Sequence, residues 1–285
     1  MRWFPKTPGQ ISSGTVGGTL RDGMLATSKK TTHEQRHFWN AYWASQPPTV
    51  TARTMSRILD RIKLEYLQSI LPGSGRTVEV GSGSGRLSCF LAALGYQTCC
   101  VDYSMTALKA AQSNYAAVER DASFVAGDAF SLPFPEDTFD VVLSTGLLEH
   151  FEDPSPIVGE MVRVLRAGGI FYSDIVPRKF SLFRSLDWAG KVNRAVTGQR
   201  LAPLYERSFT SREIHNLLAS HGLVGPRVFP AGVLPPYLPL LYRSRRLREA
   251  EVRLVERTEA FWKRFDGTRW AEWLGFYYFA WAIKP

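Results

Sequence analysis

The sequence predicts an α/β protein with a mostly parallel, Rossmann-like sheet and helices on both of its faces. Three observations lead to this fold class. Short runs rich in β-branched residues alternate with helical patterns. A glycine-rich turn follows the first run, and acidic residues stand at the ends of the next two, where ligands bind in such sheets. The first four predicted strands lie at residues 77–80, 97–101, 123–126 and 137–144.

The region before the first strand divides into two parts. Residues 1–30 are rich in Gly, Ser, Thr and Pro and lack periodicity, so we expect them to be disordered. Residues 31–72 are expected to be helical. They contain an aromatic helical segment at residues 38–43 and a second helical pattern at residues 54–71.

The turn after the first strand contains three glycines, Gly81, Gly83 and Gly85, separated by serines. Glycine tolerates unusual dihedral angles and lets a ligand approach the backbone closely. The helix that follows presents free backbone N–H groups and its positive dipole end to such a ligand. The turn therefore predicts a cradle for a nucleotide-type cofactor.

Two neighbouring residues indicate which cofactor this cradle takes. A dinucleotide-binding turn has the spacing G-x-G-x-x-G, whereas Arg86 stands here in place of the last glycine. Glu79 precedes the turn and is expected to direct a carboxylate into the cradle. That charge would repel a pyrophosphate and suits a ligand that carries an ammonium group. A dinucleotide-dependent oxidoreductase is therefore a disfavoured alternative.

The next strands also end in polar residues. Asp102 stands at the tip of the second strand, where a carboxylate suits the two hydroxyls of a ribose. Asp128 follows the third strand and Thr145 the fourth. Alone, either acidic residue is more often a helix cap or a turn residue. At the carboxyl ends of successive strands, they together predict one ligand site.

In this order, the glycine turn, Asp102, the Gly127-Asp128-Ala129 segment and the turn before the fifth strand resemble the motifs of class I S-adenosylmethionine-dependent methyltransferases. The resemblance covers about residues 75–231 and is closest to the small-molecule branch, which includes quinone and natural-product methyltransferases. It implies a seven-stranded sheet whose antiparallel last strand, at residues 273–283, lies between the fifth and the sixth. The implied cofactor is S-adenosyl-L-methionine, with binding residues Glu79, Gly81, Ser82, Gly83, Gly85, Asp102, Tyr103, Asp128, Ala129 and Thr145.

Residues 73–285 are thus expected to form the methyltransferase domain, with insertions at about residues 177–207 and 232–269. Between the insertions, Thr210 or Ser211 is expected to cap a helix. The resemblance makes residues 31–72 a lid, and we expect lid and insertions to cover an apolar or aromatic acceptor. The aromatic residues expected in this pocket are Trp39, Tyr42, Trp43, Phe183, Trp188, Tyr205 and Tyr237.

A methyl acceptor that reacts through a hydroxyl needs a base. His150 follows the fourth strand, beside the expected transfer site, and an unperturbed histidine titrates near neutral pH. The alternative is that Glu149 and His150 shape the loop. This loop lacks the Asn/Asp-Pro-Pro-aromatic tetrapeptide of base-amino methyltransferases, a nucleophilic cysteine and a convincing carboxylate cluster. Metal-independent O-, N- or C-methylation of a small molecule therefore remains.

The chain of 285 residues has a formal net charge of +9, which raises the question of a nucleic-acid partner. The late basic run at residues 243–253 alternates with glutamates, which is typical of a solvated amphipathic helix. A contact with an anionic substrate or a membrane surface stays open. We expect no nucleic-acid partner, although an RNA-modifying or RNA-binding protein with the same fold is the main alternative.

Two features bear on location. The three cysteines have no metal-binding spacing and read as small core residues, which fits a reducing cytoplasm. No apolar run resembles a signal peptide, and the apolar stretch at residues 233–241 is too short and proline-broken to span a bilayer. We therefore expect a cytoplasmic protein.

Overall fold

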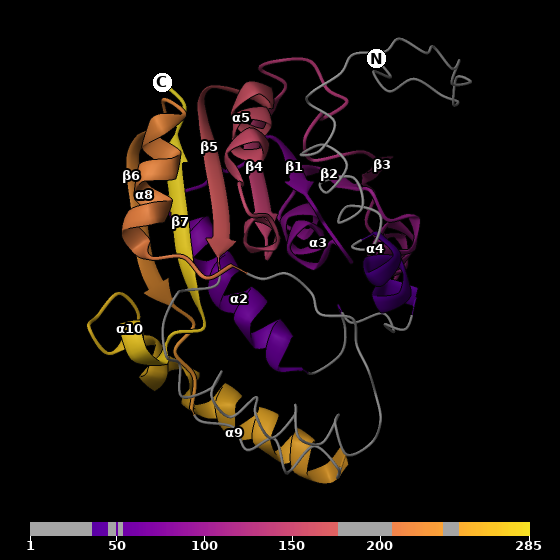
Figure 1. Ribbon diagram of the computed structural model, residues 1–285. Helices are drawn as coiled ribbons and strands as arrows, with labels where there is room; N and C mark the ends of the chain where they lie inside the picture. Colours follow the sequence, from indigo (N-terminus) through magenta and orange to yellow (C-terminus); the bar gives the residue numbers. More distant parts are fainter. Residues whose placement is uncertain (1–35, 45–49, 51–53, 176–206, 236–244) are drawn as a thin grey trace. The chain divides into compact units, whose positions relative to one another are not determined.

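A computed structural model describes residues 36–44, 50, 54–175, 207–235 and 245–285. In this part of the chain, seven strands form one sheet in the order β3-β2-β1-β4-β5-β7-β6 (Figure 1). The strands are β1 (Arg76–Val80), β2 (Gln97–Asp102), β3 (Ser123–Ala126), β4 (Phe139–Thr145), β5 (Leu165–Ile175), β6 (Val224–Ala231) and β7 (Tyr277–Ile283).

The direction of the strands confirms the predicted fold class. Strands β1 to β5 pair in parallel, and β7 runs antiparallel between β5 and β6. The carboxyl ends of β1, β2 and β4 therefore meet at one edge of the sheet, which is where ligands bind in open α/β sheets.

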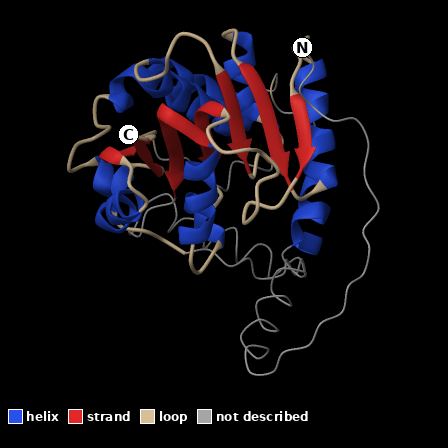
Figure 2. Cartoon of the chain, turned by 90° about the horizontal axis from the view of Figure 1, so that it is seen from above, coloured by secondary structure: helices blue, strands red, loops and turns tan. Residues whose placement is uncertain are grey.

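Helices cover both faces of the sheet (Figure 2). The face of Val142 packs against α5 and α8, and the face of Val141 and Leu143 packs against α2, α3 and α9. Beyond a helix at residues 36–44, the elements are α2 (Met55–Gln68), α3 (Arg86–Ala93), α4 (Met105–Ala116), the 3-10 turn η1 (Leu148–His150), α5 (Ser155–Val164), α8 (Ser211–Ser220), α9 (Arg245–Lys263) and α10 (Ala271–Leu274).

The burial of both faces explains the sequence of the central strands. Val141, Val142 and Leu143 are all fully buried, although they alternate between the two faces. A parallel strand covered on both sides needs a continuous apolar run instead of an alternating one. Each such side chain contributes about 1.5–3 kcal/mol through burial.

The prediction that the last strand begins at residue 273 is wrong. Residues 271–274 form the short helix α10, and the N–H of Gly275 donates to the carbonyl of Ala271 over 2.8 Å. Strand β7 begins only at Tyr277, and Trp273 and Phe276 before it are 61% and 40% exposed. An apolar run without alternation does not distinguish a strand from the end of a helix, which is why the pattern misled.

Two further expectations can be compared with the described residues. Among them, no helix is long and apolar enough to cross a membrane. The cysteines are buried and unbridged, and burial raises the pKa of the Cys89 thiol to about 11 and that of Cys99 to about 12. Thiols with such raised pKa values are poor nucleophiles near neutral pH, consistent with a core role.

The predicted cap of α8 is confirmed, with Thr210 as the capping residue. Its hydroxyl accepts from the N–H of Glu213 over 3.2 Å, and the Glu213 carboxylate accepts from the N–H of Thr210 over 2.8 Å. This reciprocal pair satisfies two N–H groups that the helix itself cannot bond.

We predict that Thr210→Ala lowers the free energy of unfolding by about 1 kcal/mol, because the α8 N-terminus loses its acceptor. Thr210→Ser keeps the hydroxyl and serves as the matched control. Urea denaturation of the two variants measures the difference. Equal midpoints would show that the cap does not contribute to stability.

Candidate cofactor-binding site

The glycine loop between β1 and α3 has a backbone that requires glycine. Gly81, Gly83 and Gly85 have φ angles of 64°, 54° and 61°, in the left-handed region. A Cβ atom on Gly83 would collide with the ring of Trp43, and one on Gly85 would lie 2.9 Å from the Cys100 sulfur. The loop therefore needs glycine for both its dihedral angles and its close contacts.

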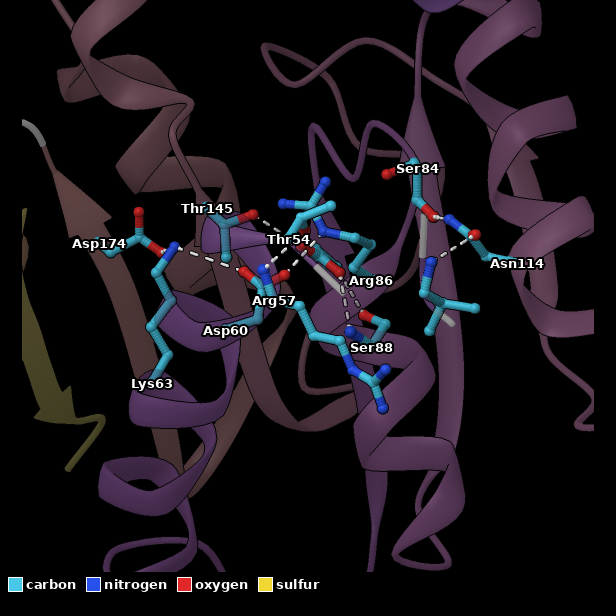
Figure 3. Close-up of polar contacts among 12 residues, drawn as sticks. Thr54, Arg57, Asp60, Lys63, Ser84, Arg86, Ser88, Asn114, Thr145 and Asp174 are labelled. Carbon is cyan, nitrogen blue, oxygen red and sulfur yellow. Dashed lines mark hydrogen bonds and ion pairs between the residues drawn. The ribbon is translucent and has the colours of Figure 1, made fainter. Parts of the chain in front are cut away.

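Two neighbouring elements, β2 and α4, hold the glycine loop in place. The N–H of Ser82 donates to the carbonyl of Val101, at the end of β2, over 2.9 Å. The side-chain amide of Asn114, on α4, donates to the carbonyl of Ser84 over 2.9 Å (Figure 3). The N–H of Val50 in turn donates to Asn114 over 3.1 Å. The loop is therefore tied to β2 and α4 as well as to its own strand and helix.

Asp102 connects the end of β2 to the glycine loop. One carboxylate oxygen accepts from the N–H of Gly83 over 2.9 Å, and the other accepts from the N–H of Ser104 over 2.8 Å. Burial raises the pKa of this carboxyl, and the two backbone hydrogen bonds oppose the shift. Each oxygen of a carboxylate has two acceptor positions, so Asp102 keeps capacity for further donors such as hydroxyls.

Glu79 lies beneath the glycine loop. Its side chain is fully buried and accepts from the N–H and hydroxyl of Ser88, over 3.1 and 2.6 Å, and from the hydroxyl of Thr145 over 2.9 Å. Burial raises its pKa, while these hydrogen bonds lower it. From the sequence, this carboxylate was expected to face the cradle directly. In the structure it is enclosed, and it connects β1, α3 and the end of β4.

Asp128 and Ala129 follow β3 at the same edge of the sheet. The N–H of Gly127 donates to the carbonyl of Asp102 over 3.2 Å, which brings the two strand ends together. The exposed side chain of Asp128 accepts from the N–H of Phe130 over 3.0 Å, an arrangement typical of a turn. Ala129 packs against the core.

The helix at residues 36–44 contacts three parts of the candidate site. Trp43 lies against Gly83 in the glycine loop. Asn40 accepts from the hydroxyl of Ser104 over 2.6 Å, just after β2. Trp39 packs edge-on against the ring of His150, after β4, with 5.0 Å between the ring centroids. The aromatic segment therefore lies over the carboxyl edge of the sheet.

Several other residues from the sequence analysis can be located. Tyr103 follows Asp102 and packs under the guanidinium of Arg36, which lies 5.3 Å from the ring centroid. Tyr42 is 41% exposed and packs against Trp39 and Trp43. The remaining predicted pocket residues lie outside the described part of the chain. They are Phe183, Trp188, Tyr205 and Tyr237.

A buried ionic cluster beside this site was missed by the sequence analysis. Lys63 on α2 pairs with Asp174 at the end of β5 over 2.9 Å, and Asp60 pairs with Arg86 over 2.7 Å (Figure 3). Burial alone would lower the pKa of Lys63, but the negative charges of Asp174 and Asp60 outweigh it and raise that pKa. The ammonium is therefore kept charged. The spacing of Asp60 and Lys63, one helical turn apart, was the only signal in the sequence.

Arg86 stands where a dinucleotide-binding turn has its last glycine, and the structure gives it a role. It joins the first turn of α3 to Asp60 on α2. Burial lowers the pKa of its guanidinium, but the negative charges of Asp60 and Glu79 outweigh burial and raise that pKa. The residue thus anchors the helix whose N-terminus faces the glycine loop.

These residues fit a nucleotide-type cofactor that carries a positive charge. The three glycines of the loop offer backbone without side chains, Asp102 offers acceptor capacity for hydroxyls, and the buried carboxyl of Glu79 lies beneath the loop. The guanidinium of Arg86 donates to Asp60 and is therefore not directed towards a pyrophosphate in the loop. The arrangement therefore agrees with the cofactor class predicted from the sequence.

Comparison with known proteins supports the same family. Residues 78–173 match the model of a methyltransferase domain family. The chain is 35% identical over 121 residues to the ubiquinone biosynthesis O-methyltransferase of Ralstonia nicotianae, covering 41% of this chain and 50% of that protein. It is 29% identical over 193 residues to the demethylmenaquinone methyltransferase of Roseiflexus castenholzii, covering 65% of this chain and 72% of that protein.

The chain spans half or less of the length of three curated relatives, namely this Ralstonia enzyme, the ajmaline N-methyltransferase of Rauvolfia serpentina and the demethylmenaquinone methyltransferase of Renibacterium salmoninarum. A solved structure of an S-adenosylmethionine-dependent methyltransferase from Thermotoga maritima has the same fold. It superposes with a TM-score of 0.54 at 20% identity, covering 81% of this chain and 91% of that one. Together with the glycine loop and the strand order, the matched methyltransferase domain and the quinone methyltransferase relatives support a class I S-adenosylmethionine-dependent methyltransferase of the quinone-like branch.

Proposed function

We propose that this protein transfers a methyl group from S-adenosyl-L-methionine to an oxygen, nitrogen or carbon atom of a small apolar or aromatic molecule, without a metal ion. The observation that carries the proposal is the glycine loop with Asp102 bonded to the N–H of Gly83. Relatives named for ubiquinone and demethylmenaquinone methylation support a quinone-like aromatic acceptor. The absence of a nucleic-acid partner and a cytoplasmic location remain parts of this proposal.

The residues at the carboxyl edge have separate roles in this proposal. Bound S-adenosylmethionine supplies a methyl group made electrophilic by a sulfonium. Asp102 would accept from the ribose hydroxyls of this cofactor, and Asp128 and Ala129 would contribute to binding its adenine. The backbone of residues 81–85 contacts the rest of the molecule, and the Glu79 carboxylate balances positive charge from beneath the loop.

The helix at residues 36–44 has the role of a lid in this proposal. Its aromatic rings already contact the glycine loop and His150. Aromatic faces exclude water and tolerate a nearby cation, with a gain of about 0.5–2 kcal/mol. Exclusion of water matters here because water competes with the acceptor for the methyl group.

The proposal is tested by incubating the purified protein with methyl-labelled cofactor and a panel of acceptors. The panel includes hydroxylated quinone precursors, aromatic amines and short RNA. Label in a small aromatic product is expected. Label in RNA would favour the alternative of an RNA-modifying enzyme, and that enzyme's binding would weaken steeply with salt.

We predict that Gly83→Val abolishes binding of S-adenosylhomocysteine, because the new side chain collides with Trp43 and strains a backbone at φ 54°. Gly222→Ala is the matched control: Gly222 has φ 76°, but a Cβ there meets nothing within 4 Å and the residue is outside the site. Calorimetry compares the two. Near-normal affinity in folded Gly83→Val would place the cradle elsewhere.

We also predict that Asp102→Ala weakens S-adenosylhomocysteine binding by at least about tenfold, since hydrogen bonds to a charged group are worth about 1.5–3 kcal/mol each. Circular dichroism must show a folded variant. Asp128→Ala removes an exposed turn acceptor of the same charge and should have a smaller effect. Unchanged affinity in Asp102→Ala would contradict the ribose assignment.

The role of His150 as a base gives a sharper prediction. His150→Ala should lower turnover of a hydroxyl acceptor by about 10²–10⁴-fold and remove a limb of the pH–rate profile near neutrality. Cofactor affinity should hardly change. The control is His221→Ala. His221 follows α8 and shares a hydrogen bond with the hydroxyl of Ser155 at the start of α5. Wild-type turnover across this pH range in His150→Ala would leave His150 with a purely structural role beside Trp39.

A further inference from the structure

The solvent-facing side of α9 and α10 has an unusual composition. We call it the 245–276 surface and define it by its exposed apolar and arginine side chains. The apolar members are Leu247, Leu254, Phe261, Trp270, Trp273 and Phe276, and the basic members are Arg246, Arg253, Arg257, Arg264 and Arg269. The apolar members have exposed fractions between 40% and 65%.

The apolar residues of α9 form a line along the helix. Leu247, Leu254 and Phe261 are spaced by seven residues, which is close to two helical turns, so they lie on one face. The opposite face carries Val252 and Val255, which are buried against the core that includes α2. Helix α9 therefore has two apolar faces: one is buried in the core, and the other, with Leu247, Leu254 and Phe261, is exposed.

The charges of α9 are sorted by face. Arg246, Arg253 and Arg257 are exposed and lie beside the apolar line. The glutamates of the same helix are partly or fully buried, and Glu259 forms an ion pair with Arg61 on α2. Among the side chains that the structure describes between residues 245 and 276, all the exposed charged ones belong to arginines. The alternation seen in the sequence thus hides a basic outer face.

The segment after α9 is held firmly to the protein. The carboxylate of Asp266 accepts from the hydroxyl of Tyr66 over 2.8 Å, and the N–H of Gly267 donates to the carbonyl of Pro230 over 2.8 Å. Trp270 and Trp273 nevertheless remain 65% and 61% exposed. The backbone of this segment is fixed while its tryptophans point to solvent. Such an exposed apolar patch is typical of an interaction surface.

The 245–276 surface lies near the edge of the sheet that carries the candidate site. Helix α9 is paired with α2 through Arg61 and Glu259 and through Glu65 and Lys263. Figure 1 shows α2 and α9 beyond the arrow tip of β5. Strand β5 ends there in Asp174, which pairs with Lys63 on α2.

We propose that the 245–276 surface docks on a lipid bilayer that contains anionic lipids. Tryptophan, phenylalanine and leucine insert at the boundary between headgroups and acyl chains, and arginines bind the headgroup phosphates. Arginine complements the negative surface charge of such a bilayer. RNA would match the arginines but would gain nothing from the line of Leu247 and Leu254. Docking brings the carboxyl edge of the sheet to a source of lipophilic acceptors.

The test is flotation of the full chain with vesicles, without cofactor or acceptor, so that its outcome is independent of methyl transfer. One vesicle is phosphatidylcholine alone, and the other contains about a third phosphatidylglycerol. The chain is expected to float with the second and to be released by salt. Binding to neither vesicle would overturn the proposal, as would binding only to RNA in a parallel gel-shift assay.

Paired variants identify the surface. Trp270→Ser with Trp273→Ser, and Arg253→Glu with Arg257→Glu, are each expected to lower vesicle binding by at least about tenfold. The controls are Leu94→Ser, at a leucine 41% exposed elsewhere, and Arg120→Glu with Arg227→Glu, at exposed arginines outside the surface. Surface variants that bind as well as these controls would contradict the assignment.

Hydrogen–deuterium exchange on the wild-type chain provides a measurement that needs no variant. Vesicles with phosphatidylglycerol are expected to slow exchange in peptides from residues 245–276. Protection confined to other regions would show that the chain meets the bilayer by a different face and would overturn the proposal.

Discussion

The buried carboxylate of Asp102 is the interaction on which the rest of the site depends. It accepts from the N–H of Gly83 and from that of Ser104, so one side chain sets both the glycine loop and the start of α4. An unpaired buried N–H costs about 1–3 kcal/mol, which is enough to change the conformation of a short loop. The residue that Asp102 holds, Gly83, has a left-handed backbone and lies against Trp43 of the helix at residues 36–44.

The site is also supported from beneath and from the side. Glu79 joins β1, α3 and β4 through Ser88 and Thr145, and the ionic cluster of Asp60, Lys63, Arg86 and Asp174 joins α2 to α3 and β5. Breaking a buried ion pair by removing one partner is costly because the other charge is left uncompensated. The carboxyl edge of the sheet is therefore a rigid platform, and rigidity of this kind favours the alignment that methyl transfer requires.

The sequence predicted the parts of this structure that depend on local rules. The glycine turn and the cap at Thr210 each have a short-range signal. The place of the last strand between the fifth and the sixth came from the family resemblance, and the structure confirms it. The pairing of Lys63 with Asp174 has no short-range signal, because residues more than a hundred positions apart meet only through the packing of α2 on the sheet. The sequence could not show that the described arginines of α9 are exposed and its glutamates partly or fully buried, because this depends on which face of α9 packs against α2. The start of β7 was misjudged because Trp273 and Phe276 have the apolar character of core residues but are exposed.

The central claim is that the glycine loop and Asp102 form a cradle for a sulfonium cofactor and not for a dinucleotide. Calorimetric titration of the wild-type chain with S-adenosylhomocysteine and, separately, with NAD tests it most directly, because both ligands carry an adenosine and differ in what is attached to it. The account predicts saturable binding of S-adenosylhomocysteine at one site per chain and no binding of NAD at the same concentrations. Binding of NAD with equal or greater affinity would contradict it.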